Sequence, residues 1–347
     1  MKTTAAVLES PNQPLRVCEL DIPLLNGGQV LVEMHWSGLC RSQLMEVQGL
    51  RGKDPYLPHL LGHEGYGQVI EVGPSVKKVK PDDKVVVTWI RGQGIQGGGS
   101  IFLDRDRKIN AGPVATFATK AVISENCCVK VDDNISGDAA SLLGCAIPTG
   151  AGIVMNEMKP RPNSSILILG AGGIGLAAIA GALICKCNPI VAVDLSEENL
   201  KLAKIFGATH TYQSSDFFEN SISSKLTGGK GFDFAVEAAG STFTIERAFN
   251  SVRDSGGLCI FASHPPEGKL ISLEPHSLIR GKKIQGSWGG ACDPDNDIPL
   301  FADLHAQGKL PLENLISHRF SLDEINDAFE ILERGNCGRV LLNLSNN

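Results

Sequence analysis

Three features are missing from this sequence of 347 residues, and each absence excludes a class of protein. No apolar stretch reaches the roughly 20 residues that a membrane span needs, so a transmembrane enzyme is excluded and no membrane partner is expected. The 32 Lys and Arg face 38 Asp and Glu, a net charge of −6, and form no basic run, so nucleic acid is not an expected partner. The first residues, MKTTAAVLESPNQPL, lack the apolar core of a signal peptide, which predicts a cytoplasmic location.

Glycine and cysteine are plentiful instead, at 39 and ten residues. Ten cysteines without a secretion signal indicate buried thiols or metal ligands rather than disulfides. The length suffices for a sizeable core and favours two domains.

The first half of the sequence has the pattern of β-strands. Apolar residues alternate with polar or small ones in residues 28–36, and further strands are predicted at 65–73 and 84–90. Turn signals at roughly ten-residue spacing favour a partly open barrel or a sandwich. Residues 91–100, RGQGIQGGGS, are predicted to form a loop.

The pattern changes near residue 147, where buried strands begin to alternate with helices. Strands are predicted at 164–170, 189–195, 232–240 and 256–263, and helices at 176–186, 196–207 and 242–252. This alternation indicates parallel βαβ units, and therefore a doubly wound, Rossmann-type α/β sheet. The pattern becomes mixed and polar after about residue 290 and ends in a predicted strand at 339–344.

A dinucleotide-binding motif, G-x-G-x-x-G, follows the first buried strand of this half. Its glycines are Gly170, Gly172, Gly173 and Gly175. The first permits the tight turn, Gly172 lets a pyrophosphate approach the backbone, and Gly175 lets helix and strand pack closely. Asp194, at the end of the next strand, would accept hydrogen bonds from the adenosine ribose and repel a 2′-phosphate, which favours NAD over NADP. The alternative is a glycine-rich turn of another α/β fold.

Three residues in the first half are candidate metal ligands: Cys40 in GLCRSQL, His63 in LGHEGYG and Cys145 in LGCAIPTG. Taken singly, each is as readily a buried thiol or an ordinary histidine, and the sequence does not bring them together. Together, two thiolates and an imidazole suit zinc, and three ligands leave a fourth position open, as in catalytic sites.

Four segments in order resemble the zinc-dependent medium-chain dehydrogenase/reductase family, of the alcohol dehydrogenase type. The segments are GLCRSQ, GHEGYGQVIEVG, LLGCAIPTG, and ILGAGGIG with VDL, and the likeness runs from residue 1 to about 342. The resemblance implies a mostly β, GroES-like catalytic domain of residues 1–146 and 291–347, with a Rossmann domain for NAD at 147–290. It also implies a homodimer or homotetramer.

The resemblance assigns roles to particular residues. It implies a zinc ion held by Cys40, His63 and Cys145, with Glu64 as a transient ligand and Ser42 taking the proton of the alcohol. For the coenzyme it implies Arg41 and Arg339 on the pyrophosphate, Thr149 and Ile174 on the nicotinamide, and Asn199 near the adenosine ribose. Trp89 would line the substrate pocket. Four of these residues also have a structural alternative: a helix cap for Ser42, core packing for Trp89, and solvated charges for Arg41 and Arg339.

The sequence departs from the family pattern at several positions. Residues 91–112 lack the four cysteines that hold a structural zinc in many members, so we expect no such site. Met45 stands where a histidine often ends a proton relay, and it cannot carry a proton. Gln43 replaces an aspartate that supports the zinc-bound histidine, so that support should be weaker or come from elsewhere. Asn199 replaces a frequent lysine and removes a charge from the ribose site.

The sequence therefore predicts a zinc-dependent, NAD-linked oxidoreductase acting on a small alcohol or polyol, or on its aldehyde or ketone. Two alternatives stay open: a zinc-free enoyl or quinone reductase of the same fold, and an inactive dinucleotide-binding or sensor protein.

Overall fold

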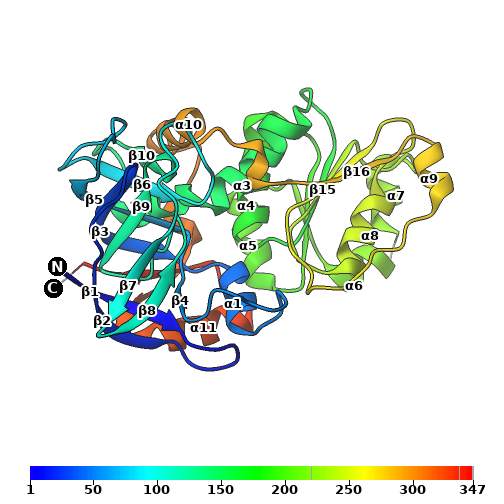
Figure 1. Cartoon of the computed structure of the whole chain (residues 1–347). Helices are drawn as coiled ribbons and strands as arrows, with labels where there is room; N and C mark the ends of the chain where they lie inside the picture. Colours follow the sequence, from blue (N-terminus) through cyan, green and yellow to red (C-terminus); the bar gives the residue numbers. More distant parts are fainter. Residues whose placement is uncertain (220, 336, 346–347) are drawn as a thin grey trace. The chain divides into compact units, whose positions relative to one another are not determined.

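The computed structural model describes residues 1–219, 221–335 and 337–345, and the chain divides into two compact units (Figure 1). Unit 1 comprises Met1–Cys145, Asp293–Gly308 and Leu312–Asn347, and unit 2 comprises Ala146–Cys292 and Lys309–Pro311. The three candidate metal ligands therefore belong to unit 1, and the glycine motif belongs to unit 2.

A small barrel forms one part of unit 1, closed in the order β1-β2-β7-β8-β4. Its strands are β1 (Lys2–Leu8), β2 (Arg16–Asp21), β4 (His59–Leu60), β7 (Ser100–Asp104) and β8 (Arg107–Ala111). The ring is closed, rather than partly open as predicted, because β4 pairs with both β1 and β8.

A larger sheet completes the β-structure of unit 1, in the order β10-β6-β5-β3-β18-β17, with β9 paired to β3. Its strands are β3 (Gln29–Gly38), β5 (Glu64–Val72), β6 (Lys84–Thr88), β9 (Lys120–Ser124), β10 (Cys128–Lys130), β17 (Ile316–Ser321) and β18 (Arg339–Asn343). Val30, Val32 and Met34 of β3 are buried in the same core cluster as Val340 and Leu342 of β18. The end of the chain thus forms part of the sheet that its first half begins.

Short helices connect and cover these strands. They are α1 (Arg41–Val47), α2 (Gly137–Ser141), α10 (Pro294–Ala306) and α11 (Ile325–Arg334), with 3₁₀ turns η1 (Glu125–Cys127), η2 (Leu142–Gly144), η5 (Leu312–Leu315) and η6 (Leu322–Glu324). Helix α11 buries Ile325, Ala328 and Phe329 in the core shared with β3 and β18.

Unit 2 is a six-stranded sheet in the order β13-β12-β11-β14-β15-β16, and every neighbouring pair is parallel. Its strands are β11 (Ile166–Leu169), β12 (Ile190–Asp194), β13 (His210–Gln213), β14 (Phe234–Glu237), β15 (Leu258–Phe261) and β16 (Lys283–Gly286). Its helices are α3 (Ala146–Gly152), α4 (Gly173–Ile184), α5 (Glu197–Ile205), α6 (Ser214–Glu219), α7 (Ile222–Thr227), α8 (Thr242–Ser251) and α9 (Pro275–Ile279), with the π-helical η3 (Ile153–Met158) and the 3₁₀ turn η4 (Gly289–Ala291).

Helices lie on both faces of this sheet, α4 and α5 on one and α7 and α8 on the other (Figure 1). The strand order reverses at β11, which pairs with β12 on one side and β14 on the other. Such a reversal marks the ligand-binding position of doubly wound sheets. The predicted fold class, a Rossmann-type sheet with a mostly β domain, is confirmed.

No single helix among the described residues is long and apolar enough to cross a membrane. One bent pair, Gly137–Gly144 with Ala146–Met158, meets the length and composition required, and most of its residues are buried.

Candidate active site

The three candidate ligands of unit 1 converge on one point. Cys40 is the N-cap of α1, His63 lies between β4 and β5, and Cys145 lies between η2 and α3. Their donor atoms all lie within 4.8 Å of one another, and His63 Nε2 is 3.2 Å from Cys145 Sγ. The topology thus brings together residues that the sequence separates by more than a hundred positions.

This cluster fits a zinc ion by donor type and spacing. Zinc–sulfur bonds of about 2.3 Å at tetrahedral angles place two thiolates about 3.8 Å apart, within the observed spread. A hydrogen bond from Cys145 holds the pKa of the Cys40 thiol well below its usual range, and His63 and Arg339 lower it further against the effect of burial. A lowered pKa favours the thiolate that metal binding requires.

In four other buried cysteines the pKa of the thiol is raised rather than lowered. Burial raises the pKa of Cys127 to about 11 and that of Cys187 to about 12, and it raises the pKa of Cys128 and Cys259 still further. Their thiols stay protonated and behave as small apolar groups. Within the described residues, Cys40, His63 and Cys145 form the single group of three or more metal-ligating side chains.

Gln43 joins two of the ligands. Its Oε1 accepts the backbone N–H of Cys40 at 2.8 Å, and its Nε2 lies 2.7 Å from His63 Nδ1. The first bond belongs to a capping box at the start of α1, in which the residue at N3 reaches back to the N-cap. Gln43, itself buried, therefore fixes both the first turn of α1 and the imidazole ring.

Glu64 and Arg339 form an ion pair beside the cluster, and both side chains are buried. Burial lowers the pKa of Arg339, and Cys40 opposes that effect. Room for the Glu64 side chain exists because Gly38 has none, since a Cβ there would lie 2.6 Å from Glu64 Oε1. The guanidinium of Arg339 thus balances negative charge on Glu64 and Cys40 together.

Ser42 and Arg41 occupy the first turn of α1 with different surroundings. The Oγ of Ser42 is buried and has no hydrogen-bond partner among the described residues, whereas Arg41 is exposed. Ser42 cannot be the helix cap, because the N-cap of α1 is Cys40. Trp89 packs edge-on against His63, with ring centroids 6.4 Å apart.

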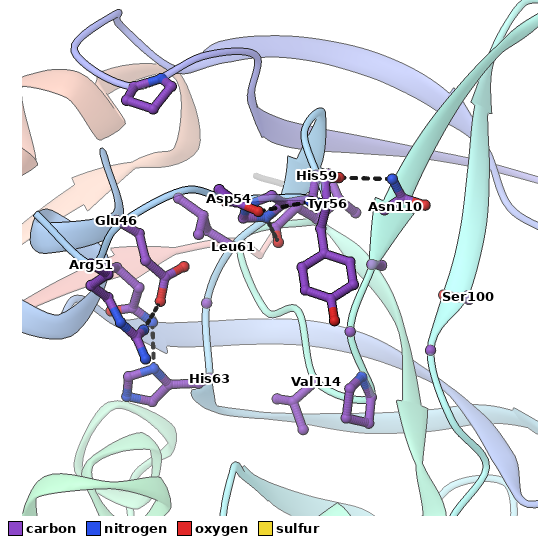
Figure 2. Close-up of a pocket in the computed structure, with 18 of the residues that line it drawn as sticks. Glu46, Arg51, Asp54, Tyr56, His59, Leu61, His63, Ser100, Asn110 and Val114 are labelled. Carbon is purple, nitrogen blue, oxygen red and sulfur yellow. Dashed lines mark hydrogen bonds and ion pairs between the residues drawn. The ribbon is translucent and has the colours of Figure 1, made fainter. Parts of the chain in front are cut away.

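A cavity of about 770 Å³ opens beside His63 and Gln43, lined entirely by residues of unit 1 (Figure 2). Figure 2 shows the Tyr56 ring reaching into its middle, with His63 and Ser100 on opposite sides. Trp89 is not among the described residues that line it.

Polar groups mark the far wall of this cavity. Ser100 is buried and its Oγ has no hydrogen-bond partner among the described residues. His59 lies between two acceptors, with Nε2 at 2.7 Å from Asp54 Oδ2 and Nδ1 at 2.9 Å from the carbonyl of Leu60. Lys53 also lines the cavity, and none of the described carboxylates lies within ion-pair distance of it. The cavity can therefore offer hydrogen bonds and positive charge to a bound molecule.

The glycine motif of unit 2 forms the turn from β11 into α4. Gly170 has φ +92°, and a Cβ there would lie 2.7 Å from the backbone of Ala239. A Cβ on Gly175 would lie 1.8 Å from the carbonyl oxygen of Gly170, so helix and strand approach too closely for a side chain. A Cβ on Gly172, by contrast, would meet nothing within 4 Å. Gly172, the N-cap of α4, therefore leaves open space at a helix N-terminus, which suits a pyrophosphate.

Asp194 ends β12 beside this turn. Its Oδ2 accepts the N–H of Ala171 at 2.6 Å, and its Oδ1 accepts the N–H of Ser196 at 2.8 Å. Asn199, which is buried, donates from Nδ2 to the same Oδ1 at 3.2 Å. Asn199 thus orients the carboxylate rather than adding charge to it.

Thr149 and Ile174 lie on α3 and α4, which touch closely. A Cβ on Gly150 would lie 2.1 Å from the carbonyl oxygen of Ile174, so the two helices meet through this glycine. The two proposed nicotinamide contacts are consequently on adjacent helices of unit 2.

Some features of the site have no signal in the sequence. The pairing of Glu64 with Arg339 joins residues 275 positions apart, and no motif contains Ser100 or Tyr56. The bond between Gln43 and the Cys40 N–H could have been anticipated from the capping-box spacing, which places Gln43 at N3 behind Cys40.

Two family profiles match the chain. Residues 26–133 match the profile described as "Alcohol dehydrogenase GroES-like domain", and residues 173–307 match "Zinc-binding dehydrogenase".

Similar proteins cover almost the whole chain. An Escherichia coli O1:K1 / APEC protein named S-(hydroxymethyl)glutathione dehydrogenase is 30% identical over 99% of this chain and 100% of its own. Benzyl alcohol dehydrogenase from Acinetobacter calcoaceticus is similar in structure, with a TM-score of 0.90, 29% identity and coverage of 99% and 100%. An alcohol dehydrogenase zinc-binding domain protein from Burkholderia ambifaria has a TM-score of 0.88 and 30% identity, with both chains covered completely.

Proposed function

Since the chain belongs to the zinc-type medium-chain dehydrogenase/reductase family, whose alcohol dehydrogenases are oxidoreductases, we propose that it transfers a hydride between an alcohol and NAD, with one catalytic zinc. The observation that carries the proposal is the convergence of Cys40, His63 and Cys145 donor atoms within 4.8 Å. Three ligands of this kind leave a fourth position for substrate, unlike a closed structural site. A zinc-free reductase would not need these three metal ligands.

Each part of the reaction has residues suited to it. Bound zinc would supply a Lewis acid for the substrate oxygen, and bound NAD would accept the hydride. The buried, unpartnered hydroxyl of Ser42 would take the proton of the alcohol. Glu64, paired with Arg339, would approach the metal as a transient ligand.

The coenzyme would be held mainly by unit 2. The open space at Gly172 and the N-terminus of α4 would bind the pyrophosphate, and Thr149 with Ile174 would contact the nicotinamide. Arg41, and the N–H groups of Arg339 that are not engaged with Glu64, would add contacts to the phosphates.

NAD is the proposed coenzyme because Asp194 stands at the end of β12. A 2′-phosphate there would face a carboxylate, and repulsion at about 4 Å and an effective dielectric near 20 is on the order of 4 kcal/mol per unit-charge pair. A third of that energy corresponds to roughly a tenfold preference for NAD. A kcat/KM with NADP equal to that with NAD would contradict the assignment.

The substrate is proposed to be an alcohol with further polar groups, such as a polyol. The cavity beside His63 carries the unpartnered hydroxyl of Ser100 and the ammonium group of Lys53. A substrate with further hydroxyl groups could accept a hydrogen bond from the ammonium group of Lys53, which a purely apolar alcohol could not.

Metal analysis and a substrate panel test the proposal together. Purified protein should contain close to one zinc per chain and should form NADH with alcohols, faster with polyols than with aliphatic alcohols of similar size. Protein expressed with zinc that contains none, or that reduces enones with undiminished activity after metal removal, would contradict the proposed function.

A further inference from the structure

Unit 2 contains a second cavity, of about 480 Å³, whose residues the proposed reaction does not use. Its lining comes from α6 and α7, the segment after α7, the end of α8 and the segment before β16. The charged residues of the lining lie in the segments that precede β14, β15 and β16. The sheet is parallel throughout, so they lie at its amino edge, whereas Gly170 and Asp194 follow β11 and β12 at the carboxyl edge. The cavity is therefore separate from the coenzyme turn.

Positive charge dominates this cavity. Four cationic side chains line it, together with one carboxylate: Lys230, Arg247, Arg280, Lys282 and Asp254. The carboxylate is already engaged, because Arg280 Nε lies 2.9 Å from Asp254 Oδ2. Among the described residues, none of the other three cations has a carboxylate within ion-pair distance. Three cations without an ion-pair partner among the described residues around one cavity are unexpected in a chain with a net charge of −6.

Arg247 is held in place by aromatic rings rather than by an acid. Its guanidinium carbon lies 5.1 Å from the centroid of Phe218 and 5.0 Å from that of Phe243. A cation–π contact engages the face of the guanidinium and leaves the N–H groups in its plane available. The side chain is consequently positioned without its donors being used.

Lys282 is partly withdrawn from solvent beside the same cavity. Its Nζ donates to the carbonyl of Asn250 at 2.7 Å and lies 5.9 Å from the ring centroid of Phe249. Burial lowers the pKa of Lys282, and the charge of Arg280 lowers it further while Asp254 opposes. A bound anion would offset the cost of holding this ammonium group among other cations.

Lys230 lies in a glycine-rich turn, TGGKG, whose backbone N–H groups point inward. The N–H of Gly229 donates to Ser224, that of Lys230 donates to Thr227, and that of Gly231 donates to the Thr227 hydroxyl. This turn therefore cannot cradle a phosphate with its backbone, as nucleotide-binding loops do. Its contribution is the exposed ammonium group of Lys230, which has no ion-pair partner within the described ranges.

We propose that this cavity binds a small molecule carrying a phosphate group, held by the side chains of Lys230, Arg247 and Lys282. A phosphate group offers three acceptor oxygens and up to two negative charges. It is therefore a better match for three cationic side chains than a carboxylate, which has two oxygens and one charge. The volume exceeds that of inorganic phosphate and lies in the range of small-ligand sites, so an organic body fits beside the phosphate.

The test is calorimetric titration of the full chain, saturated with NADH, with pyrophosphate and with inorganic phosphate at constant ionic strength. Saturation with NADH blocks the phosphate site of the coenzyme turn, so binding that persists belongs elsewhere. We expect saturable binding of pyrophosphate to the wild-type protein. Its affinity should fall about tenfold or more in Lys230→Gln and in Arg247→Gln, since each loses a charge-assisted contact.

Lys225→Gln is the matched control, because Lys225 is an exposed lysine on α7 that does not line the cavity. This variant should bind pyrophosphate within twofold of wild type. NADH binding should be unchanged in all three variants, which also shows that unit 2 is folded. Absence of saturable binding in the presence of NADH would overturn the proposal. So would equal losses in Lys225→Gln and Lys230→Gln, which would show a nonspecific effect of charge.

Discussion

Gln43 is the residue through which the first turn of α1 influences metal binding. Its amide oxygen accepts from Cys40 N–H while its amide nitrogen faces His63 Nδ1. A histidine that binds zinc through Nε2 carries its hydrogen on Nδ1, so two donors would then face each other. The glutamine must either release Cys40 or leave His63 without an acceptor. An acidic residue of the same length could accept from both groups.

Gln43→Glu should therefore bind zinc about tenfold more tightly than wild type, within the range known for groups that support a metal-bound histidine. Chelator competition with a colorimetric zinc indicator measures this affinity without requiring activity. Gln43→Met, which keeps the length but accepts no strong hydrogen bond, should bind zinc at least tenfold more weakly than Gln43→Glu, because neither Cys40 N–H nor His63 Nδ1–H then has an acceptor at this position.

Gln93→Glu serves as a control, because it adds the same charge at an exposed loop position of the same unit. Its zinc affinity should equal that of wild type. If Gln43→Glu gave no tighter binding than this control, the hydrogen-bond conflict at His63 would not exist in the metal-bound protein.

Ser42 is expected to act on the proton rather than on the metal. Its hydroxyl is buried in the first turn of α1 without a hydrogen-bond partner in the part of the chain that the structure describes, and the N-cap role belongs to Cys40. Ser42→Ala should slow single-turnover alcohol oxidation by about 100-fold, the lower end of proton-transfer catalysis, with zinc content unchanged. Ser42→Thr should retain much of the rate because it keeps the hydroxyl. A transient in Ser42→Ala that matches wild type at every pH would exclude a role in proton transfer.

At the scale of elements, one carboxylate, that of Glu125, connects the glycine-rich loop at 91–100 to the segment at 77–78. Glu125 is buried at the start of η1 and accepts the N–H groups of Lys77, Lys78 and Ile95 at 2.6–2.7 Å. Burial alone would raise its pKa, but these three bonds outweigh it and lower the pKa. A segment with little intrinsic preference for any conformation is thereby ordered against β9 and β10.

Glu125→Gln should lower the melting temperature at pH 7 by roughly 4–8 °C, as expected for a loss of about 2 kcal/mol from a unit of this size. The pKa of Glu125 is lower in the folded protein than in the unfolded chain. The stabilisation by its charge is therefore fully present at pH values above the pKa of the unfolded chain, and it disappears as the pH falls through the pKa of the folded protein. Calorimetric scans at pH 7 and pH 3 should therefore show a smaller difference between wild type and variant at the lower pH. A constant difference would show that the charge of Glu125 contributes nothing.

The elements predicted from the sequence are those with a strong local pattern. The β11–α4–β12 unit was predicted within a few residues, because a continuous apolar strand, a glycine turn and an apolar helix each leave a distinct signal. The β7–β8 hairpin was not predicted, since β7 exposes Ile101 and Leu103 and is stabilised by its barrel neighbours instead. The seven-residue α1 and the two-residue β4 are too short for any periodicity to show.

In the site too, some features have a local signal in the sequence and others depend on tertiary packing. Cys40, His63 and Cys145 stand out by residue type, but their meeting depends on the barrel and sheet of unit 1. Asn199 was expected only to remove a charge, whereas its buried amide orients Asp194, a role that depends on the turn from β12 into α5. Contacts between distant segments are set by tertiary packing, which no local pattern encodes.

For the whole molecule, the division into two units separates the metal ligands from the glycine turn. Cys145→Ser should therefore lose zinc and alcohol oxidation, because serine is a poor ligand for zinc, while NADH fluorescence titration still shows coenzyme binding. Cys127→Ala is the matched control. It changes a buried cysteine of the same unit whose thiol lies outside the cluster, and it should keep its zinc.

Zinc and NADH should each stabilise a different unit against unfolding, because a ligand stabilises only the unit that binds it. At 100 times its Kd, zinc adds about 2.7 kcal/mol to the folded state that holds it. Calorimetry of the wild-type protein should show that a chelator lowers one unfolding transition and that NADH raises another. In Cys145→Ser the chelator should have no effect, while the shift caused by NADH remains. If Cys145→Ser abolished NADH binding as well, coenzyme binding would depend on the metal centre, and the two units would not bind their ligands independently.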